Sequence, residues 1–379
     1  MFDAALPLLK RLKEMCELHC LLEFDMQEGN IFGITKEMFG RKFYMEGREL
    51  LREHKLATFL PIENTTLIKC YPPKFAIKHF QTQYYENKVI SAIKPDFVYF
   101  YNIPLQSSLY ILLNKGKWAT AVHDPIPHSN ENKFHMLVRS VICWPIYKYC
   151  KYYFLFSNKL IEGFKKYRGL TYQNIYETKL GPYETLNINE ESIKDNHNEL
   201  RLLFFGKIKS YKGLRYLLKA YKVIKEKYQA NVSLTIAGSG YIENDIIDLN
   251  TYPGLYVYNR YITHDELAKF INNCDIVVCP YTDATQSGVI MSSYAFCKPV
   301  IASNVGGLSE MVDDGLNGVL IEPCNSSSIV DAVLRIVNDK EVINKWEKNL
   351  RNKYYDGEDG WTSIATHLLD QISNILKEI

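Results

Sequence analysis

Long apolar runs, an excess of one charge and paired cysteines are all missing from this chain of 379 residues. No apolar run approaches the roughly 18 residues of a membrane-spanning helix, so we expect neither a span nor a secretory leader. The net charge of +2 creates no field that would favour nucleic acid as a partner. Nine cysteines are scattered without a C-x-x-C pair, which is typical of a reducing compartment. These absences predict a cytoplasmic protein.

Metal-binding patterns are missing as well. Cys16 and Cys20 flank His19, but no second ligand pair follows, so buried free thiols are the simpler interpretation. Asp313 and Asp314 are adjacent rather than spaced for a metal, and no Asp-x-Asp follows a predicted strand. We therefore expect no metal and no other cofactor.

What the chain does have is a length suited to two domains, in which strands alternate with helices. Apolar residues make up 47% and charged residues 23%, so each half can bury a core. The alternation predicts parallel β-α-β units and an α/β fold class. A polar stretch without periodicity, 186–199, predicts a linker between a first domain at 1–185 and a second at 200–355. Residues 356–379 contain a final amphipathic helix.

The second half begins with a basic loop between a strand and a helix. The strand expected at 201–205 runs into Gly206, where a missing side chain would let a ligand approach the backbone. Three lysines follow: Lys207, Lys209 and Lys212. The start of a helix binds anions, and lysine suits a diphosphate, so the loop predicts a phosphate site. A solvated basic loop is the alternative.

Two further loops follow strand ends in the same way, at 278–289 and 299–310. The residues there that could face a ligand are Gln286, Ser287, Gly288 and Glu310. Ordinary helix capping is the alternative in both loops. Because ligands bind beyond the carboxyl ends of parallel strands, the three loops together predict one shared anion and sugar site.

The second half also carries a series of motifs that resembles a known family. In order they are GK-x4-KG, IAGSG, CDIVVCPY, SGV-x4-YAFCKPVIAS and VGGLSEMV-x2-G-x2-G, over about 150 residues. This series resembles the family-4 retaining glycosyltransferases. The resemblance implies the GT-B architecture, with two Rossmann-like domains facing across a cleft. It implies a nucleotide-sugar donor on the second domain, an acceptor on the first, and a terminal helix that crosses back to the first. The implied activity is retaining transfer of a sugar to a glycan or lipid-linked acceptor in glycan assembly.

The resemblance also implies roles for individual residues. The family places a basic pair on the donor diphosphate, here Lys207 and Lys212, so that lysine replaces a metal as the counter-charge. Residues 286–288 occupy the stretch whose backbone, in the family, faces the donor sugar. A strand-end histidine of the first domain faces the same sugar, which implies a catalytic role for His123. A purely structural histidine is the alternative.

One departure from the family pattern concerns two glutamates spaced eight residues apart. They should fall at Ala284 and Ser292, and neither position is acidic. Ser292 then stands at the ribose contact, and Asp283 is the nearest acid that could replace the first glutamate. The loss motivates a rival reading, a catalytically silent binding partner of an active transferase. A sugar-nucleotide epimerase of the same architecture is a second rival, but it would need acidic and histidine pairs that we do not find.

A basic and aromatic stretch runs from Lys133 to Arg168, with a net charge of +7 over 36 residues. Aromatic rings are interleaved with these charges: Trp144, Tyr147, Tyr149, Tyr152 and Tyr153. The combination predicts peripheral contact with anionic lipid at the inner face of the membrane. A solvated basic face is the alternative.

The start of the chain differs from the family pattern. The residues 2–6 already read as a first helix, whereas the family opens on a buried strand and a glycine loop. We therefore expect the opening strand to be missing from the first sheet. The alternative is that 19–24 is the first strand of a rearranged sheet.

Overall fold

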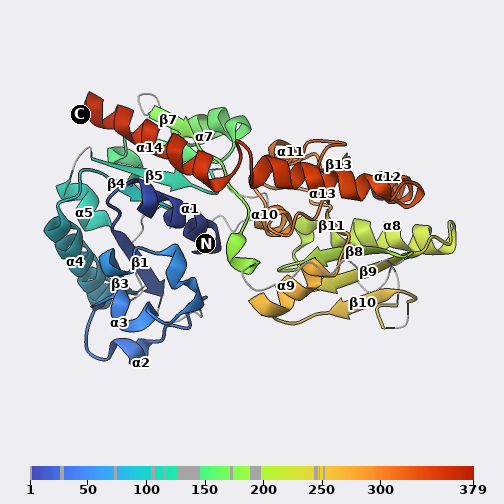
Figure 1. Ribbon diagram of the computed structural model, residues 1–379, viewed down its shortest axis with the longest axis horizontal. Coiled ribbons are helices and arrows are strands. Elements are labelled where there is room, and N and C mark those ends of the chain that lie inside the picture. Colours follow the sequence, from blue (N-terminus) through green and yellow to red (C-terminus); the bar gives the residue numbers. More distant parts are fainter. Residues whose placement is uncertain are drawn as a thin grey trace. The chain divides into compact units, whose positions relative to one another are not determined.

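The computed structural model describes residues 2–25, 30–71, 75–103, 107–114, 117–125, 146–170, 174–187, 198–242, 246, 248–250 and 252–379. The chain divides into two compact units, the first made of Met1–Lys179 with Trp361–Ile379 and the second of Leu180–Gly360 (Figure 1). The middle of the expected linker, 188–197, lies outside the described residues. So does the stretch 126–145, which includes Lys133, Arg139 and Trp144.

The second unit is built on one parallel sheet. Its strands are β8 (Leu200–Phe205), β9 (Val232–Ala237), β10 (Leu255–Tyr258), β11 (Ile276–Cys279), β12 (Val300–Ser303) and β13 (Gly318–Ile321). They lie in the order β10-β9-β8-β11-β12-β13. The order reverses between β8 and β11, and ligands in open parallel sheets bind where the order reverses, beyond the carboxyl ends of the strands.

Helices flank this sheet and complete its core. They are α8 (Leu214–Glu226), α9 (His264–Asn272), α10 (Gly288–Tyr294), α11 (Leu308–Met311), α12 (Ser326–Asn338) and α13 (Glu341–Tyr354). Apolar residues of α8 and α12 form one buried cluster with residues of the sheet, for example Leu217, Val333 and Leu234. Almost every residue of β8, β11 and β12 is buried, which is typical of a parallel sheet covered on both faces.

The first unit contains two sheets. One has the order β1-β3-β2, formed by β1 (Cys20–Asp25), β3 (Thr65–Cys70) and β2 (Tyr44–Glu46). The other has the order β4-β5-β6-β7, formed by β4 (Val98–Phe100), β5 (Trp118–Val122), β6 (Tyr152–Leu155) and β7 (Asn174–Glu177). Strand β1 corresponds to the strand expected at 19–24. It pairs with β3 and, within the described strands, not with β4.

Helices and turns connect these strands. The helices are α1 (Phe2–Met15), α2 (Lys36–Phe39), α3 (Gly47–Leu51), α4 (Ala76–Ile93), α5 (Ser108–Leu113), α7 (Ile161–Arg168) and α14 (Trp361–Glu378). Short 3-10 turns lie at Lys55–Phe59, Ile62–Asn64, Asn158–Leu160, Glu184–Leu186 and, in the second unit's basic loop, Ser210–Lys212. The terminal helix α14 belongs to the first unit, where its Ile364 and Leu368 pack with Leu8 of α1 over β5 and β6 (Figure 1).

Two carboxyl groups lie against each other in the first unit, the half-buried Glu23 and the buried Glu86. Glu86 of α4 is 1% exposed, accepts a hydrogen bond from the Ser107 hydroxyl and interacts with Glu23 of β1. Burial raises the pKa of Glu23 to about 7 and raises the pKa of Glu86 well above its usual range. The second carboxyl adds to the shift of Glu86, because two like charges this close are unfavourable. The pair therefore retains protons near neutral pH.

This carboxyl pair predicts a stability that falls as the pH rises. The unfolded chain loses these protons near pH 4.5, whereas the folded chain keeps them up to about pH 7. The folded state therefore binds more protons between these values, and stability is lost as the pH rises through that window. Glu86→Gln is expected to be more stable than the native chain at pH 8 by about 1–3 kcal/mol, with little difference at pH 4.5. Urea unfolding at both pH values measures this, and the exposed Glu53→Gln is the control. Equal pH dependence in the two variants would contradict it.

Candidate functional site

The loops after β8 and β11 touch at the point where the strand order reverses. The Thr282 amide and hydroxyl both donate to the Tyr211 carbonyl, at 2.7 and 3.2 Å. Gly213, which precedes α8, has φ of +68°, and a Cβ there would lie 1.9 Å from the Pro280 carbonyl oxygen. Only glycine fits this position, so the start of α8 is held directly against the β11 loop.

The loops after β9 and β12 join the same cluster. The Ile208 amide donates to the Ser239 carbonyl at 2.8 Å, which ties the basic loop to the loop after β9. In the β12 loop, Gly306 has φ of +47°, and a Cβ there would lie 1.8 Å from the Ala284 carbonyl oxygen. The three loops that the sequence singled out therefore lie together at one edge of the second unit's sheet.

Lys212 is the most unusual residue of this cluster. Its side chain is 8% exposed, and its Nζ lies 5.4 Å from the centre of the Tyr281 ring. A Cβ on Gly206 would lie 2.9 Å from this Nζ, so the glycine leaves the ammonium group room beside the backbone. Burial, and then the charge of Lys209, lower the pKa of Lys212.

No carboxylate in the described part of the chain offsets a charge on this buried side chain. Among the described residues, no carboxylate forms an ion pair with Lys212. The Cys279 thiol lies nearby, but burial raises its pKa to about 12, so the thiol stays neutral. A buried ammonium group without a counter-ion is costly, and it is a ready partner for an anionic ligand.

The two lysines of the expected basic pair differ in their surroundings. Lys207 is exposed, whereas Lys212 is buried. Gly206, between β8 and Lys207, has φ of +98°, a conformation that favours glycine. Tyr281, which the sequence analysis missed as a site residue, forms one wall beside the Lys212 ammonium. The signal that could have identified Tyr281 is its position in the CDIVVCPY motif, at the end of a predicted strand.

The hydroxyl groups at the start of α10 have local partners. The Ser287 hydroxyl is buried and accepts from the Ile290 amide at 3.3 Å, which is the capping role named as the alternative. The Ser292 hydroxyl is also buried and donates to the Gly288 carbonyl at 2.8 Å. Gln286 and Gly288 are half-buried. A ligand at this loop would therefore meet the Gln286 side chain and the backbone before either serine.

The two acidic candidates lie at the rim of the cluster. Asp283 is half-buried and precedes Ala284, whose carbonyl contacts Gly306. Glu310 is exposed in α11, directly after the double glycine of the β12 loop. Within the described residues, no group of three or more His, Cys, Asp or Glu side chains is placed to hold a metal ion.

His123 lies in the first unit, just after β5. Its Nε2 donates to the Tyr101 carbonyl at 2.9 Å, and its ring stacks on Phe156 with the ring centres 4.3 Å apart. Burial lowers the pKa of His123. The imidazole is therefore neutral at pH 7, with the proton on Nε2 and an acceptor lone pair on Nδ1.

The expected membrane contact at Lys133 to Arg168 needs correction for two of its rings. Tyr152 and Tyr153 lie in β6 and are 5% and 0% exposed, so they cannot reach a lipid surface. Arg168 lies over the Tyr147 ring, 4.0 Å from its centre. In the part of the chain that the structure describes, no helix is long and apolar enough to cross a membrane.

Comparison with known proteins identifies the second unit. Residues 187–353 match the family described as glycosyl transferases group 1. This part of the chain is a glycosyl transferases group 1 domain. The resemblance read from the motifs is thereby confirmed at the level of this family.

One curated relative is similar to about half of this chain. The chain is 30% identical over 197 residues to an uncharacterized glycosyltransferase of Methanocaldococcus jannaschii, a match that covers 50% of this chain and 48% of the relative. The chain spans about half the length of the curated relatives it matches.

Solved structures confirm the GT-B fold. Sucrose-phosphate synthase from Thermosynechococcus elongatus matches with a TM-score of 0.65 and 16% identity, over 98% of this chain and 92% of that one. Anabaena HepE in complex with UDP-glucose matches with a TM-score of 0.64 and 14% identity, over 99% and 96% of the two chains. The group 1 domain is therefore one of two Rossmann-like units of a GT-B fold, as predicted.

Proposed function

We propose that the chain is a retaining glycosyltransferase whose group 1 domain binds a nucleoside-diphosphate sugar. The sugar is transferred to a hydroxyl of a glycan or lipid-linked acceptor. The observation that carries this proposal is the buried Lys212 ammonium group, which has no counter-ion among the described residues and lies beside Gly206.

The chemistry of a diphosphate complements this arrangement. A nucleoside diphosphate carries two or more negative charges, and a desolvated lysine interacts with them strongly. Helix α8, with 13 residues, begins at the same loop and adds the free amides and positive dipole of its first turn. Lys212 then supplies the counter-charge that a metal supplies in other sites. The UDP-glucose bound by HepE, which shares the fold, supports a nucleotide sugar as the donor.

The reaction requires one bond to break and one to form at the same sugar carbon. The bond from the anomeric carbon to the diphosphate oxygen breaks, and the electron pair stays on the diphosphate. The acceptor hydroxyl oxygen bonds to that carbon on the same face, and its proton passes to the departing phosphate oxygen. Lys212 stabilises the charge that develops on the diphosphate. We assign His123 a catalytic role in which its Nδ1 accepts a hydrogen bond from a substrate hydroxyl, since its Nε2 donates to the Tyr101 carbonyl.

A catalytically silent binding protein is the rival function. It is motivated by Ala284 and Ser292, which stand where the resembled family has glutamates. Asp283, half-buried in the β11 loop, is the acid that we propose replaces the first of them. The rival is a silent binding partner of an active transferase, which requires no turnover of its own, whereas the transferase requires both nucleotide binding and turnover.

Two assays separate these functions. A thermal-shift screen against UDP, GDP, ADP and their sugars should identify one base that raises the melting temperature. Release of that nucleoside diphosphate from its sugar should then be measurable and should persist in EDTA. His123→Ala is expected to lower turnover by about 100-fold or more with a much smaller change in donor affinity. Binding without any release would favour the silent partner, and no binding to any nucleotide would reject the transferase.

A further inference from the structure

Helix α4 of the first unit exposes an apolar stripe. Ile77, Phe80 and Tyr84 are 79%, 62% and 50% exposed, although a helix of a globular protein normally turns such residues inward. Their spacing of three and four residues places them on one face of the helix. The stripe therefore lies on the surface of this unit as a continuous apolar strip.

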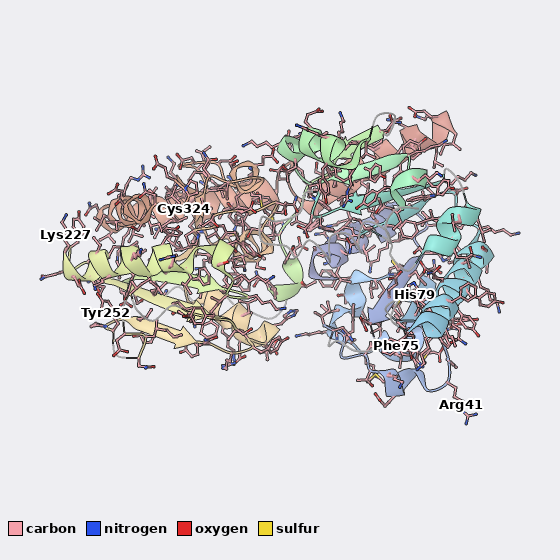
Figure 2. The ribbon with its side chains drawn as sticks, turned by 180° about the vertical axis from the view of Figure 1, so that it is seen from behind. Arg41, Phe75, His79, Lys227, Tyr252 and Cys324 are labelled. Carbon is pink, nitrogen blue, oxygen red and sulfur yellow. The ribbon has the colours of Figure 1, made fainter. Side chains whose placement is uncertain are left out.

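A series of aromatic contacts runs from this strip through half-buried rings and the buried Tyr71 to the exposed Phe75. Tyr84 contacts Tyr85 edge to face, with the ring centres 5.3 Å apart, and Tyr85 stacks on Phe43 at 5.0 Å. Phe43 contacts Tyr71, and Tyr71 contacts Phe75, at 6.2 and 6.3 Å. Figure 2 shows Phe75 and His79 close together at one end of α4. Amphipathic rings of this kind favour the boundary between water and lipid.

The exposed charges of α4 are positive. Lys78 and Lys88 are exposed, and Lys78 lies over the Tyr71 ring. The acid of this helix, Glu86, is buried and retains its proton. Arg41, near the end of the strip, is also exposed, and Figure 2 shows it projecting outward from the same unit.

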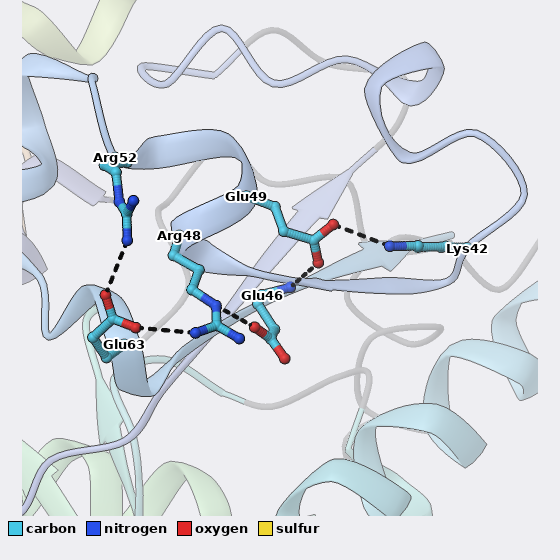
Figure 3. A network of polar contacts seen from close by, with 6 residues as sticks. All are labelled: Lys42, Glu46, Arg48, Glu49, Arg52 and Glu63. Atoms are coloured by element: carbon cyan, nitrogen blue, oxygen red, sulfur yellow. Dashed lines mark hydrogen bonds and ion pairs between the residues drawn. The ribbon is translucent and has the colours of Figure 1, made fainter.

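A neighbouring surface of the same unit is different, because its cations are paired. Around α3, Figure 3 shows a network of ion pairs: Lys42 with Glu49 at 3.0 Å, Arg48 with Glu46 at 2.6 Å and with Glu63 at 3.5 Å, and Arg52 with Glu63 at 3.6 Å. These glutamates neutralise the basic side chains around α3. No such ion pair involves Lys78 or Lys88 within the described residues.

We propose that the stripe of α4 docks the first unit on an anionic phospholipid surface. Ile77 and Phe80 would enter the boundary between headgroups and acyl chains, and Lys78 and Lys88 would contact lipid phosphates. Interfacial helices combine these two features, an apolar face and flanking basic residues. The core of a protein interface is instead depleted of lysine, which makes a protein partner a poorer match. The inference needs only α4, so it stands independently of the transfer reaction.

The test is sedimentation of the full chain with vesicles. Vesicles of phosphatidylcholine with phosphatidylglycerol are compared with vesicles of phosphatidylcholine alone. Binding is expected only to the anionic vesicles. Ile77→Ser with Phe80→Ser, or Lys78→Glu with Lys88→Glu, should each weaken it by about tenfold or more. Matched controls in the second unit are Leu316→Ser with Tyr261→Ser for exposed apolar area, and Lys345→Glu for charge. Circular dichroism and melting temperature verify folding.

Three results would overturn the proposal. The first is no sedimentation with anionic vesicles at low salt. The second is binding that the α4 variants retain as fully as the control variants do. The third is a dimer in size-exclusion chromatography that the serine variant loses, without vesicle binding, since a second copy of the chain would then cover the stripe.

Discussion

Lys212→Met is expected to weaken nucleoside-diphosphate binding by about 10- to 150-fold and, at the same time, to make the ligand-free protein more stable. The native lysine is buried at a position where no described carboxylate offsets a positive charge, and this burial lowers its pKa. Methionine of similar length removes the cost of that charge, which outweighs the loss of the contact with the Tyr281 ring. The free energy of unfolding should rise by about 1–3 kcal/mol at pH 7.

The loss of binding has the same origin. A hydrogen bond to a charged group contributes about 1.5–3 kcal/mol, so affinity should fall roughly 10- to 150-fold. Calorimetric titration measures the affinity, and urea unfolding measures the stability. The exposed Lys207→Met is the control, for which we expect a smaller loss of affinity and no gain in stability.

The pH dependence gives a second check on the stability effect. Burial lowers the pKa of Lys212 below its value of 10.5 in an unfolded chain. Between the two values the unfolded chain binds more protons, so the native protein gains stability as the pH rises towards 10.5. The variant lacks this gain, and its advantage should shrink at high pH. A variant less stable than the native chain at every pH would contradict the assignment of an uncompensated cation.

Gly213→Ala is expected to cause a large loss of stability for the addition of a single methyl group. The new Cβ would lie 1.9 Å from the Pro280 carbonyl oxygen, and φ of +68° disfavours any side chain. Backbone cannot move aside as a flexible side chain could, so the cost should be about 3 kcal/mol or more. Nucleotide affinity should fall as well, because the start of α8 must shift.

Gly315→Ala separates the effect of the steric contact from the effect of the backbone conformation. Gly315 has φ of +75° but nothing within 4 Å of the added Cβ. Gly315→Ala should lower the free energy of unfolding by only about 1–2 kcal/mol, because only the backbone conformation is unfavourable. Urea unfolding compares the two variants directly. An equal loss in both would mean that the contact between the basic loop and the β11 loop is not rigid.

The strands and glycine loops of the second unit could be predicted from sequence because their signals are local. Buried runs such as 201–205 end at glycines, and parallel strands bring their carboxyl ends together. The burial of Lys212 could not be predicted. It depends on Tyr281, which is distant in sequence and is brought beside the lysine only by the neighbouring position of β8 and β11. The sequence shows only that Lys212 lies in a basic loop. It does not show that the side chain is buried or that no described carboxylate lies beside it.

The first unit shows two other limits of sequence reasoning. A count of charges and rings marked Lys133 to Arg168 as a surface, but Tyr152 and Tyr153 are part of a central strand. Helix α4 escaped prediction because its apolar residues, among them the buried Ile90 and the exposed Ile77, are distributed around the helix rather than along one side. The sequence of α4 therefore does not separate an apolar side from a polar side, which is the pattern that marks a period of 3.6 residues.

A crystal structure with a bound nucleotide tests the central claim most directly. The ligand should be whichever nucleoside diphosphate stabilises the native chain most in the thermal-shift screen. We expect a phosphate oxygen within hydrogen-bond distance of the Lys212 Nζ, beside the Gly206 backbone and the first turn of α8. A nucleotide bound elsewhere, with Lys212 still buried and unpaired, would contradict the account.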